Sequence, residues 1–220
     1  MPRPLVTLSY AQSLDGSIAA VPRQPLALSG PESMAFAHQL RAAHDAILVG
    51  IGTVLPDNPR LTVRLVSGPN PQPIVLDSRL RFPRGANLLR HPRPPWIATT
   101  ARADPERQAA LEAAGAHVLR LPADDCGRVH LPSLLAALTD SGIKTLMVEG
   151  GSAVITSFLS ARLVDRIALT LAPRLVGGVR AVAAPCDVPL HNVAYRTLGA
   201  DLIVEADVTP VSTDVKRINR

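Results

Sequence analysis

Short aliphatic runs alternate with helix-like segments along nearly all of this 220-residue chain, and this alternation constrains its fold most strongly. Val6–Tyr10, Ala46–Val49 and Thr145–Val148 are three of these runs. Runs of this kind are typical of strands buried on both faces, and the helices between them supply the crossovers of a parallel sheet. The pattern predicts an α/β fold in which helices cover a mostly parallel sheet.

The other predicted elements follow the same pattern. Strands are predicted at 73–76, 96–99, 117–121, 164–171 and 202–207, and helices at about 29–43, 105–114, 131–139 and 152–161. Most of the 21 prolines fall between these elements, and no repeat or low-complexity tract interrupts them. We therefore expect residues 1–220 to form a single domain, which is an ordinary size for this class.

Charge and composition narrow the possible partners. The formal net charge is +5, yet only 3% of the residues are aromatic. Proteins that bind single-stranded nucleic acids need aromatic rings on which bases stack, and here the arginines are scattered rather than gathered in one tract. A basic enzyme with a phosphorylated ligand accounts for the charge, so we expect no nucleic-acid partner.

Cysteine and histidine spacing argues against a metal site or a disulfide scaffold. Cys126 and Cys186 are the only cysteines, and the six histidines form no HxxxH or HxH pair. The N-terminus lacks the apolar run of a signal peptide, and no uncharged apolar stretch reaches the length of a membrane span. The expectation is a cytoplasmic protein without metal or membrane association.

Four polar or glycine-containing segments follow predicted strands, where open α/β sheets bind ligands. The first is Gln12–Gly16, which is either an ordinary Asp-Gly turn or a place where the backbone at Ala11 and Gln12 lies against a flat ring. The second is Val49–Val54, whose glycines permit close approach of the backbone and whose Thr53 offers a hydroxyl. It lacks the third glycine of a dinucleotide fingerprint.

A proline-constrained polar loop, Asp57–Arg64, follows this second segment. Arg60 and Arg64, with Arg41 from the preceding helix, are suited to a phosphate fork because guanidinium matches phosphate oxygens in bidentate fashion. A solvated loop is the alternative.

The third segment, Leu76–Arg81, ends a strand in Asp-Ser with two arginines nearby. Ser78, Arg79 and Arg81 suit the 2′-phosphate of an NADP ribose, although a merely charged loop has the same composition.

The fourth segment, Met147–Val154, carries Glu149 to the end of a strand, and Gly150-Gly151 then opens a helix. Exposed amides at a helix N-terminus bind anions, so this turn is a candidate pyrophosphate cradle. The alternative is a tight connection in which glycine only eases the geometry.

Five strings occur in one order along the chain: SLDG at 13–16, LRAAHDAILVGIGTVLPDNPRLTVR at 40–64, VLDSRLRFP at 75–83, VEGG at 148–151 and LVDRIALTLAPRLVGG at 163–178. Together they resemble the pyrimidine reductase family of riboflavin biosynthesis, whose domain also forms the C-terminal half of bifunctional deaminase-reductases. The long second string is the specific one.

The resemblance implies a dihydrofolate-reductase-like three-layer fold, a homodimer, and NADPH as hydride donor. It implies reduction of the ribosyl group of 5-amino-6-(5-phosphoribosylamino)uracil, or the related diaminopyrimidinone, to the ribitylamino product. The expected cofactor contacts are Ala11, Thr53, Asp57, Ser78, Arg79, Gly150, Gly151, Ser152, Ala153 and Val154. The expected substrate contacts are Arg41, Asn58, Leu61, Arg64 and Glu149. No catalytic residue is assigned, with Asp57 and Glu149 as candidates.

The chain departs from the family pattern in two places. Asn58 stands where an acid is common, and Val21–Leu28 reads VPRQPLAL where relatives often carry Ser-x-Trp. The second departure leaves open another pterin or pyrimidine substrate, or a non-catalytic nucleotide-binding protein. The HxE and PCxxC zinc pattern of a fused deaminase is absent from the sequence, so neither zinc nor deamination is expected.

Overall fold

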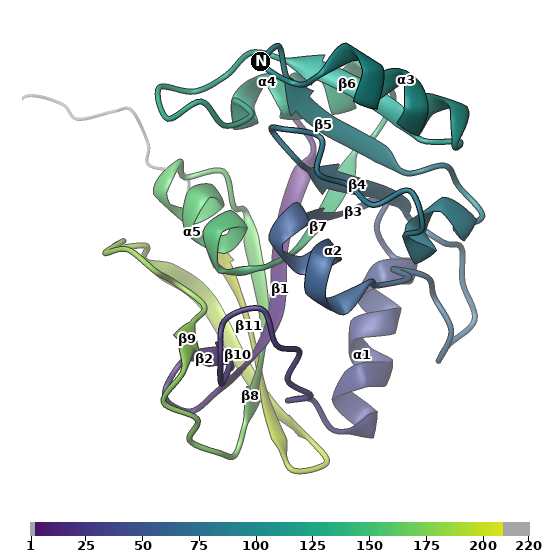
Figure 1. Cartoon of the computed structure of the whole chain (residues 1–220). Helices are drawn as coiled ribbons and strands as arrows, with labels where there is room; N and C mark the ends of the chain where they lie inside the picture. Colours follow the sequence, from purple (N-terminus) through teal and green to yellow (C-terminus); the bar gives the residue numbers. More distant parts are fainter. Residues whose placement is uncertain (1–2, 209–220) are drawn as a thin grey trace, which may run out of the picture.

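A nine-stranded sheet with helices on both faces organises the computed structural model, which describes residues 3–208 (Figure 1). Residues 1–2 and 209–220 of the expected domain lie outside the described residues. In sheet order the strands are β10 (Leu190–Leu198), β11 (Asp201–Val208), β8 (Arg166–Ala172), β1 (Leu5–Ser13), β7 (Thr145–Gly150), β3 (Ala46–Gly50), β4 (Gln72–Leu76), β5 (Trp96–Thr100) and β6 (His117–Leu121). All pairs from β8 to β6 are parallel, whereas β11 pairs antiparallel with both β8 and β10. The predicted mostly parallel sheet is confirmed.

Helices form a layer on each face of this sheet. They are α1 (Pro31–Ala42), α2 (Ile51–Asp57), α3 (Pro105–Ala113), α4 (Leu131–Asp140) and α5 (Ser152–Ser160), with a short 3₁₀ helix, η1 (Asn87–Arg90). Apolar residues of α4 and α5 share one core cluster with one face of the strands, and those of α2 and α3 share another with the opposite face. Consecutive strand residues such as Met147 and Val148 fall in opposite clusters, as the period of a strand requires. The three-layer arrangement is confirmed.

The sequence did not predict α2, η1, or strands β2 (Ser17–Ala19), β9 (Val179–Arg180) and β10. Helix α2 contains Gly52, Thr53 and Pro56, all of which lower helix propensity. Nearly every residue of β10 is exposed, so this edge strand lacks the apolar alternation that announces a half-buried strand. Its hydrogen bonds to β11 hold it in place.

The parallel topology brings the carboxyl ends of β1, β3, β4 and β7 to one edge of the sheet. At this edge the N-termini of α2 and α5 come close together, although the two helices lie on opposite sides of β1 (Figure 1). Gly50 makes the approach possible, because a Cβ there would lie 2.7 Å from Cγ2 of Val154 in α5. No other residue type leaves room for that contact without a shift of the helix.

Candidate active site

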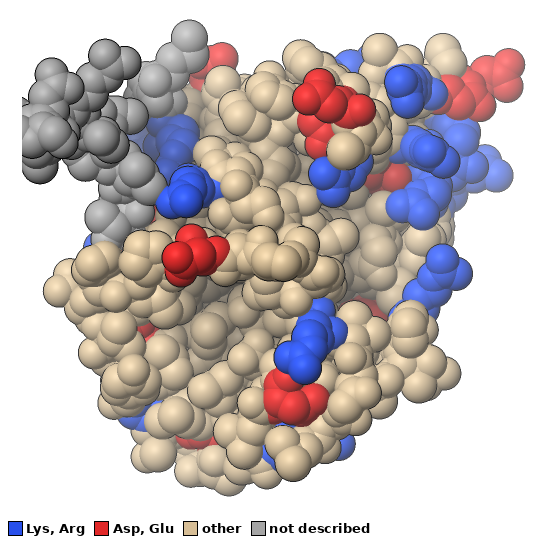
Figure 2. Space-filling view, turned by 90° about the vertical axis from the view of Figure 1, so that its left-hand side faces the viewer, with Lys and Arg blue, Asp and Glu red and all other residues tan. Residues whose placement is uncertain are grey.

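A cleft of about 1530 Å³ opens at the carboxyl ends of these strands. Its walls come from β1, α2, the β4–η1 loop, residues 124–132, the first turns of α5, and residues 22–29. On the face shown in Figure 2, basic side chains gather in the upper part, whereas the hollowed centre carries mainly uncharged side chains. The cleft can therefore receive a molecule with both apolar rings and anionic groups.

Most of the predicted cofactor contacts line this cleft. Those that do are Ala11, Thr53, Asp57, Ser78, Arg79, Gly151, Ser152, Ala153 and Val154. Gly150 does not line it; it lies behind the wall with a φ of +115°, and its peptide bond to Gly151 is cis. The segments that the sequence placed after separate strands are thus brought together in space.

The N-terminus of α5 has the features of an anion site. No side chain caps this helix, and its backbone hydrogen bonds begin at the amide of Val154, so the amides before it remain available. A Cβ at Gly151 would lie 3.2 Å from Oγ1 of Thr53 in α2. The glycine therefore keeps open a gap between the two helices, and the positive end of the helix dipole faces it. A pyrophosphate fits this chemistry.

At the other end of the cleft, Ser78 has a structural role as well. Its Oγ accepts a hydrogen bond from the backbone amide of Val129 (3.1 Å), and its carbonyl accepts one from Oγ1 of Thr100 (3.0 Å). Arg81 lies 3.7 Å from the buried carboxyl of Asp77, whose pKa is raised by burial. Arg79 is exposed and makes no ion pair with any residue in the range 3–208.

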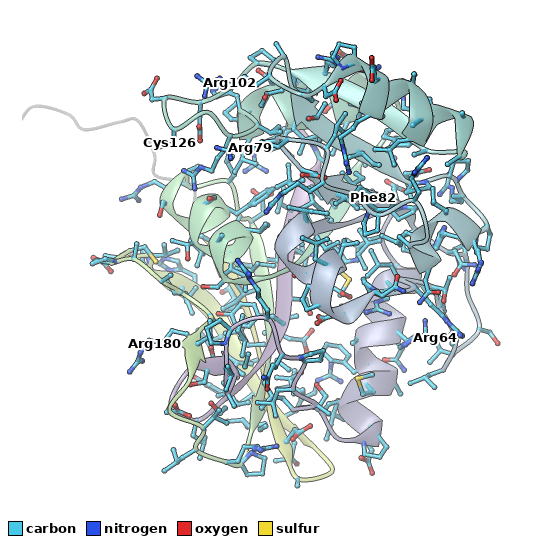
Figure 3. All side chains as sticks on the ribbon, in the orientation of Figure 1. Arg64, Arg79, Phe82, Arg102, Cys126 and Arg180 are labelled. Carbon is cyan, nitrogen blue, oxygen red and sulfur yellow. The ribbon has the colours of Figure 1, made fainter. Side chains whose placement is uncertain are left out.

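Sequence reasoning missed the loop of residues 122–130, which forms part of this wall. Arg128 in this loop donates to Oγ of Ser157 in α5 (3.3 Å) and lies 3.3 Å from Oδ2 of Asp124. Figure 3 shows Cys126 of the same loop near Arg79 and Arg102, above α5. Only the Asp-Cys-Gly turn composition could have drawn attention to the loop, because its contacts are made with segments distant in sequence.

The predicted substrate contacts lie outside the wall of the cleft, mostly on the α1 face of the sheet. The guanidinium of Arg41 donates to both carboxylate oxygens of Glu149, over 2.7 and 2.9 Å. Arg41 also donates to the carbonyl oxygen of Thr62 (3.4 Å), and Arg64 donates to the same oxygen (3.3 Å). Two guanidiniums from separate segments therefore converge on one backbone oxygen. In Figure 3 Arg64 lies beside α1, across the view from Arg79.

This arginine cluster of Arg41, Arg60 and Arg64 carries more positive than negative charge. Burial opposes the charge of Arg41, but the Glu149 carboxylate outweighs it, so the pKa of Arg41 is raised. Partial burial and the charges of Arg41 and Arg60 lower the pKa of Arg64, while Glu149 acts in the opposite sense. Within residues 3–208, neither Arg60 nor Arg64 forms an ion pair. A phosphate monoester, with about −2 charge, would balance the cluster.

The side chains of Asn58 and Leu61 serve the fold. Asn58 ends α2 in a left-handed conformation, and its Oδ1 accepts a hydrogen bond from the amide of Asn87 (2.8 Å). The side chain of Leu61 is 2% exposed within the core. At Leu61 only backbone atoms can reach a ligand. Of the two candidate catalytic carboxyls, Asp57 lies in the cleft, where desolvation raises its pKa, and Glu149 lies in the pair with Arg41.

The Asp-Gly turn after β1 has a structural role, because Asp15 ties it to the segment at residues 176–177. Asp15 accepts hydrogen bonds from the hydroxyls of Ser13 (2.5 Å) and Ser17 (2.7 Å), and from the amides of Val176 and Gly177 (2.9 and 2.8 Å). These four donors hold the pKa of Asp15 below its usual range. Of the two interpretations of this segment, the ordinary turn describes Asp15, while Ala11 lines the cleft.

Two further features of the described residues bear on other classes of protein. Across residues 3–208, no group of three histidine, cysteine, aspartate or glutamate side chains is placed to hold a metal ion. No helix in the same range has the length and apolar character needed to span a membrane. The absence of zinc and of deamination stays a prediction.

Comparisons with known proteins agree with the resemblance. Residues 4–204 match the family described as the RibD C-terminal domain. The 2,5-diamino-6-ribosylamino-4(3H)-pyrimidinone 5′-phosphate reductase of Methanothermobacter thermautotrophicus is 39% identical over 218 residues, covering 94% of this chain and 99% of the relative. Riboflavin biosynthesis protein RibD of Bacillus amyloliquefaciens is 39% identical over 180 residues, and the match covers 81% of this chain but 48% of that protein.

Solved structures agree on the fold. The riboflavin biosynthesis reductase of Saccharomyces cerevisiae superposes with a TM-score of 0.78 at 29% identity, covering 94% of this chain and 90% of the other. Dihydrofolate reductase of Enterococcus faecalis gives a TM-score of 0.58 at 15% identity, over 95% and 99% of the two chains, and confirms the predicted fold. Since the family match spans most of the sequence, the chain belongs to the RibD C-terminal domain family.

Proposed function

We propose that this chain reduces the ribosyl group of a phosphorylated ribosylaminopyrimidine to the ribitylamino product, with NADPH as hydride donor. The observation that carries the proposal is the convergence of Arg41 and Arg64 on one carbonyl oxygen, where Arg41 pairs with Glu149 and Arg64 has no ion-pair partner within residues 3–208. Two relatives at 39% identity are named as a ribosylaminopyrimidinone phosphate reductase and as riboflavin biosynthesis protein RibD. The first matches this chain almost end to end, and the second matches it over about half of its own length. Family, fold and charge distribution support the same reaction.

The arginine cluster would bind the 5′-phosphate of the substrate. Arg41 is held rigidly by its two hydrogen bonds to Glu149, so little rotamer freedom is lost when it meets a phosphate oxygen. The free lone pairs of Glu149 can accept hydrogen bonds from N–H groups of the pyrimidine. Substrate recognition thus combines a positioned guanidinium with an oriented carboxylate.

NADPH would occupy the cleft, with its pyrophosphate at the N-terminus of α5 and its 2′-phosphate near Ser78, Arg79 and Arg81. When bound, it supplies the hydride that adds to C1′ of the opened ribosylamine. An iminium carbon is already electrophilic, so the protein contributes mainly by holding the two partners in register and excluding water. Asp57, which lines the cleft and whose pKa is raised by desolvation, is the candidate to orient a donor.

The oligomeric state and the cellular location belong to the same proposal. A homodimer is supported by the outer strand β10, whose Leu190, Val193 and Tyr195 are 40%, 37% and 68% exposed. A cytoplasmic location is expected for a biosynthetic enzyme of this kind. Light scattering of the purified protein tests the first, and a monomer would contradict it.

The decisive experiment mixes the enzyme with NADPH and either the aminouracil or the diaminopyrimidinone form of the substrate. Oxidation of NADPH with appearance of the ribitylamino product supports the proposal and identifies the preferred form. Oxidation only with another pterin or pyrimidine would favour the alternative left open by Val21–Leu28, of which residues 22–28 line the cleft. Binding of NADPH without turnover of any of these would indicate a non-catalytic nucleotide-binding protein.

A further inference from the structure

His38, on α1 beside the arginine cluster, was not singled out by any sequence motif. Its side chain is 1% exposed, and it precedes Arg41 by less than one helical turn. A buried histidine on an amphipathic helix is an unusual choice, because an apolar residue would fill the same volume without the cost of burying two ring nitrogens. The contacts of those nitrogens account for its presence.

The Nδ1 atom of His38 accepts a hydrogen bond from the backbone amide of Arg64, over 2.9 Å and across 26 residues of sequence. An accepting Nδ1 places the ring hydrogen of the neutral imidazole on Nε2. Burial, followed by the charges of Arg41 and Arg64, lowers the pKa of His38, while the Glu149 carboxylate acts against this shift. The ring is therefore neutral at physiological pH, which is the state that can accept from Arg64.

The hydrogen bond to His38 acts on the segment that carries two of the three arginines of the cluster, Arg60 and Arg64. The amide of Val63 donates to Oδ1 of Asn70 (2.7 Å), and the next amide, that of Arg64, donates to His38. The Arg64 guanidinium then folds back onto the carbonyl oxygen and Oγ1 of Thr62, at 3.3 and 2.7 Å. The histidine ties this backbone to α1, the same helix that presents Arg41.

The other ring nitrogen argues against a purely stabilising role. Nε2 of His38 is buried and has no hydrogen-bond partner among the described residues. An unsatisfied buried donor is destabilising, so this nitrogen does not account for the presence of a histidine here. The contribution of the ring is the hydrogen bond at Nδ1, which links α1 to the backbone of Arg64.

We propose that His38 is a positioning residue that holds Arg64 beside Arg41 so that both guanidiniums meet the substrate phosphate. The inference rests on the proposed function, since it assumes that the arginine cluster receives that phosphate. His38 acts through the backbone of Arg64 and does not itself touch the reacting atoms.

The test compares His38→Leu with His38→Asn. Leucine fills a similar volume but offers no acceptor, whereas Oδ1 of asparagine can occupy the place of Nδ1. We expect His38→Leu to raise KM for the phosphorylated substrate about tenfold, as loss of one charge-assisted contact would, with kcat nearly unchanged. His38→Asn should recover most of that loss. The Kd for NADPH should stay at the wild-type value in both variants.

A dephosphorylated substrate provides the matched control, because it cannot engage the arginine cluster. With it, wild type and His38→Leu should have the same KM. The role of His38 would be overturned if His38→Leu kept the wild-type ratio of KM values for the two substrates. It would also be overturned if His38→Leu and His38→Asn raised KM for the phosphorylated substrate equally. A wild-type enzyme that treats both substrates alike would instead overturn the proposed function. Should His38→Leu fail to fold, His38→Gln replaces it, because its amide reaches toward the Nε2 position.

Discussion

The cleft wall at α5 and the arginine cluster on the α1 face are built in different ways. The α5 side of the cleft wall is made of backbone and glycine within one short stretch, Gly151–Val154, backed by Gly50. The arginine cluster is made of long side chains from distant segments, and Arg41 pairs with Glu149, which lies 108 positions away in the sequence. A backbone site depends on close approach and fails completely when a Cβ intrudes. A side-chain site depends on charge and orientation, so each substitution there removes only a share of the binding free energy.

The largest effect is expected at Gly151. Gly151→Val would place a branched side chain against Thr53, where even a Cβ lies 3.2 Å from Oγ1, and would close the gap at the helix N-terminus. We expect the Kd for NADPH to rise by about a hundredfold or more, or about 3 kcal/mol, in a fluorescence titration. Circular dichroism and the melting midpoint should remain near wild type.

Gly85→Ala is the control for this variant, since nothing lies within 4 Å of the added Cβ. If Gly151→Val unfolds, the glycine serves mainly a tight connection. If it folds and binds NADPH normally, the pyrophosphate does not bind at this turn.

The next effect is expected at Arg64. Arg64→Ala should lower kcat/KM about ten- to a hundredfold, because a charge-assisted contact contributes about 1.5–3 kcal/mol. Arg41→Ala should lower it similarly and also reduce stability, since it leaves the Glu149 carboxylate without its partner at a site where the two side chains are 15% and 17% exposed. NADPH affinity should barely change in either.

Arg166→Ala removes an exposed ion pair with Asp207, 61% and 47% exposed, and should leave both kinetics and stability close to wild type. If Arg64→Ala lost affinity for NADPH but kept its affinity for the substrate, the arginine cluster would bind the cofactor and the cleft would bind the substrate.

A smaller effect is expected on cofactor choice. Removing Arg79 and Arg81 together should reduce the preference for NADPH over NADH by roughly tenfold, because exposed arginines bind phosphate in a solvent-screened setting. Titration of both nucleotides against wild type and the double variant measures this. Equal affinity of the wild type for the two nucleotides contradicts the proposed NADPH preference, and an unchanged preference in the double variant removes these arginines from the 2′-phosphate site.

The smallest effect is expected on the pH dependence of the free energy of unfolding. Burial is the main cause that lowers the pKa of both His38 and His91 in the folded protein. The unfolded chain then binds more protons, so the free energy of unfolding should fall as pH drops below the ordinary histidine value of 6.5. Urea midpoints at about pH 7.5 and about pH 5.5 should differ less in His38→Asn and in His91→Asn than in wild type. An identical pH dependence of the urea midpoint in all three proteins would show that neither His38 nor His91 causes it.

The same contrast explains how much could be predicted from sequence. The parallel sheet, its main helices and the backbone-built wall were predictable, because each is encoded by local periodicity or by glycines next to a strand end. The pairing of Arg41 with Glu149, the meeting of both arginines at Thr62, and the contact of His38 with Arg64 depend on tertiary packing. Similarly, the left-handed backbone conformations of Asn58 and Leu61 and the burial of the Leu61 side chain are set by the tertiary structure and could not be predicted from residue type.

The contact between Gly50 and Val154 has a consequence for redesign of the enzyme. Because a Cβ at position 50 would meet Val154 at 2.7 Å, the floor of the cleft can be altered only by paired changes, such as a smaller residue at 154 together with alanine at 50. The rim is different, since residues 22–28 and 124–130 line the cleft from loops. Laboratory evolution toward bulkier nucleotides should therefore accumulate substitutions at the rim and leave the floor untouched.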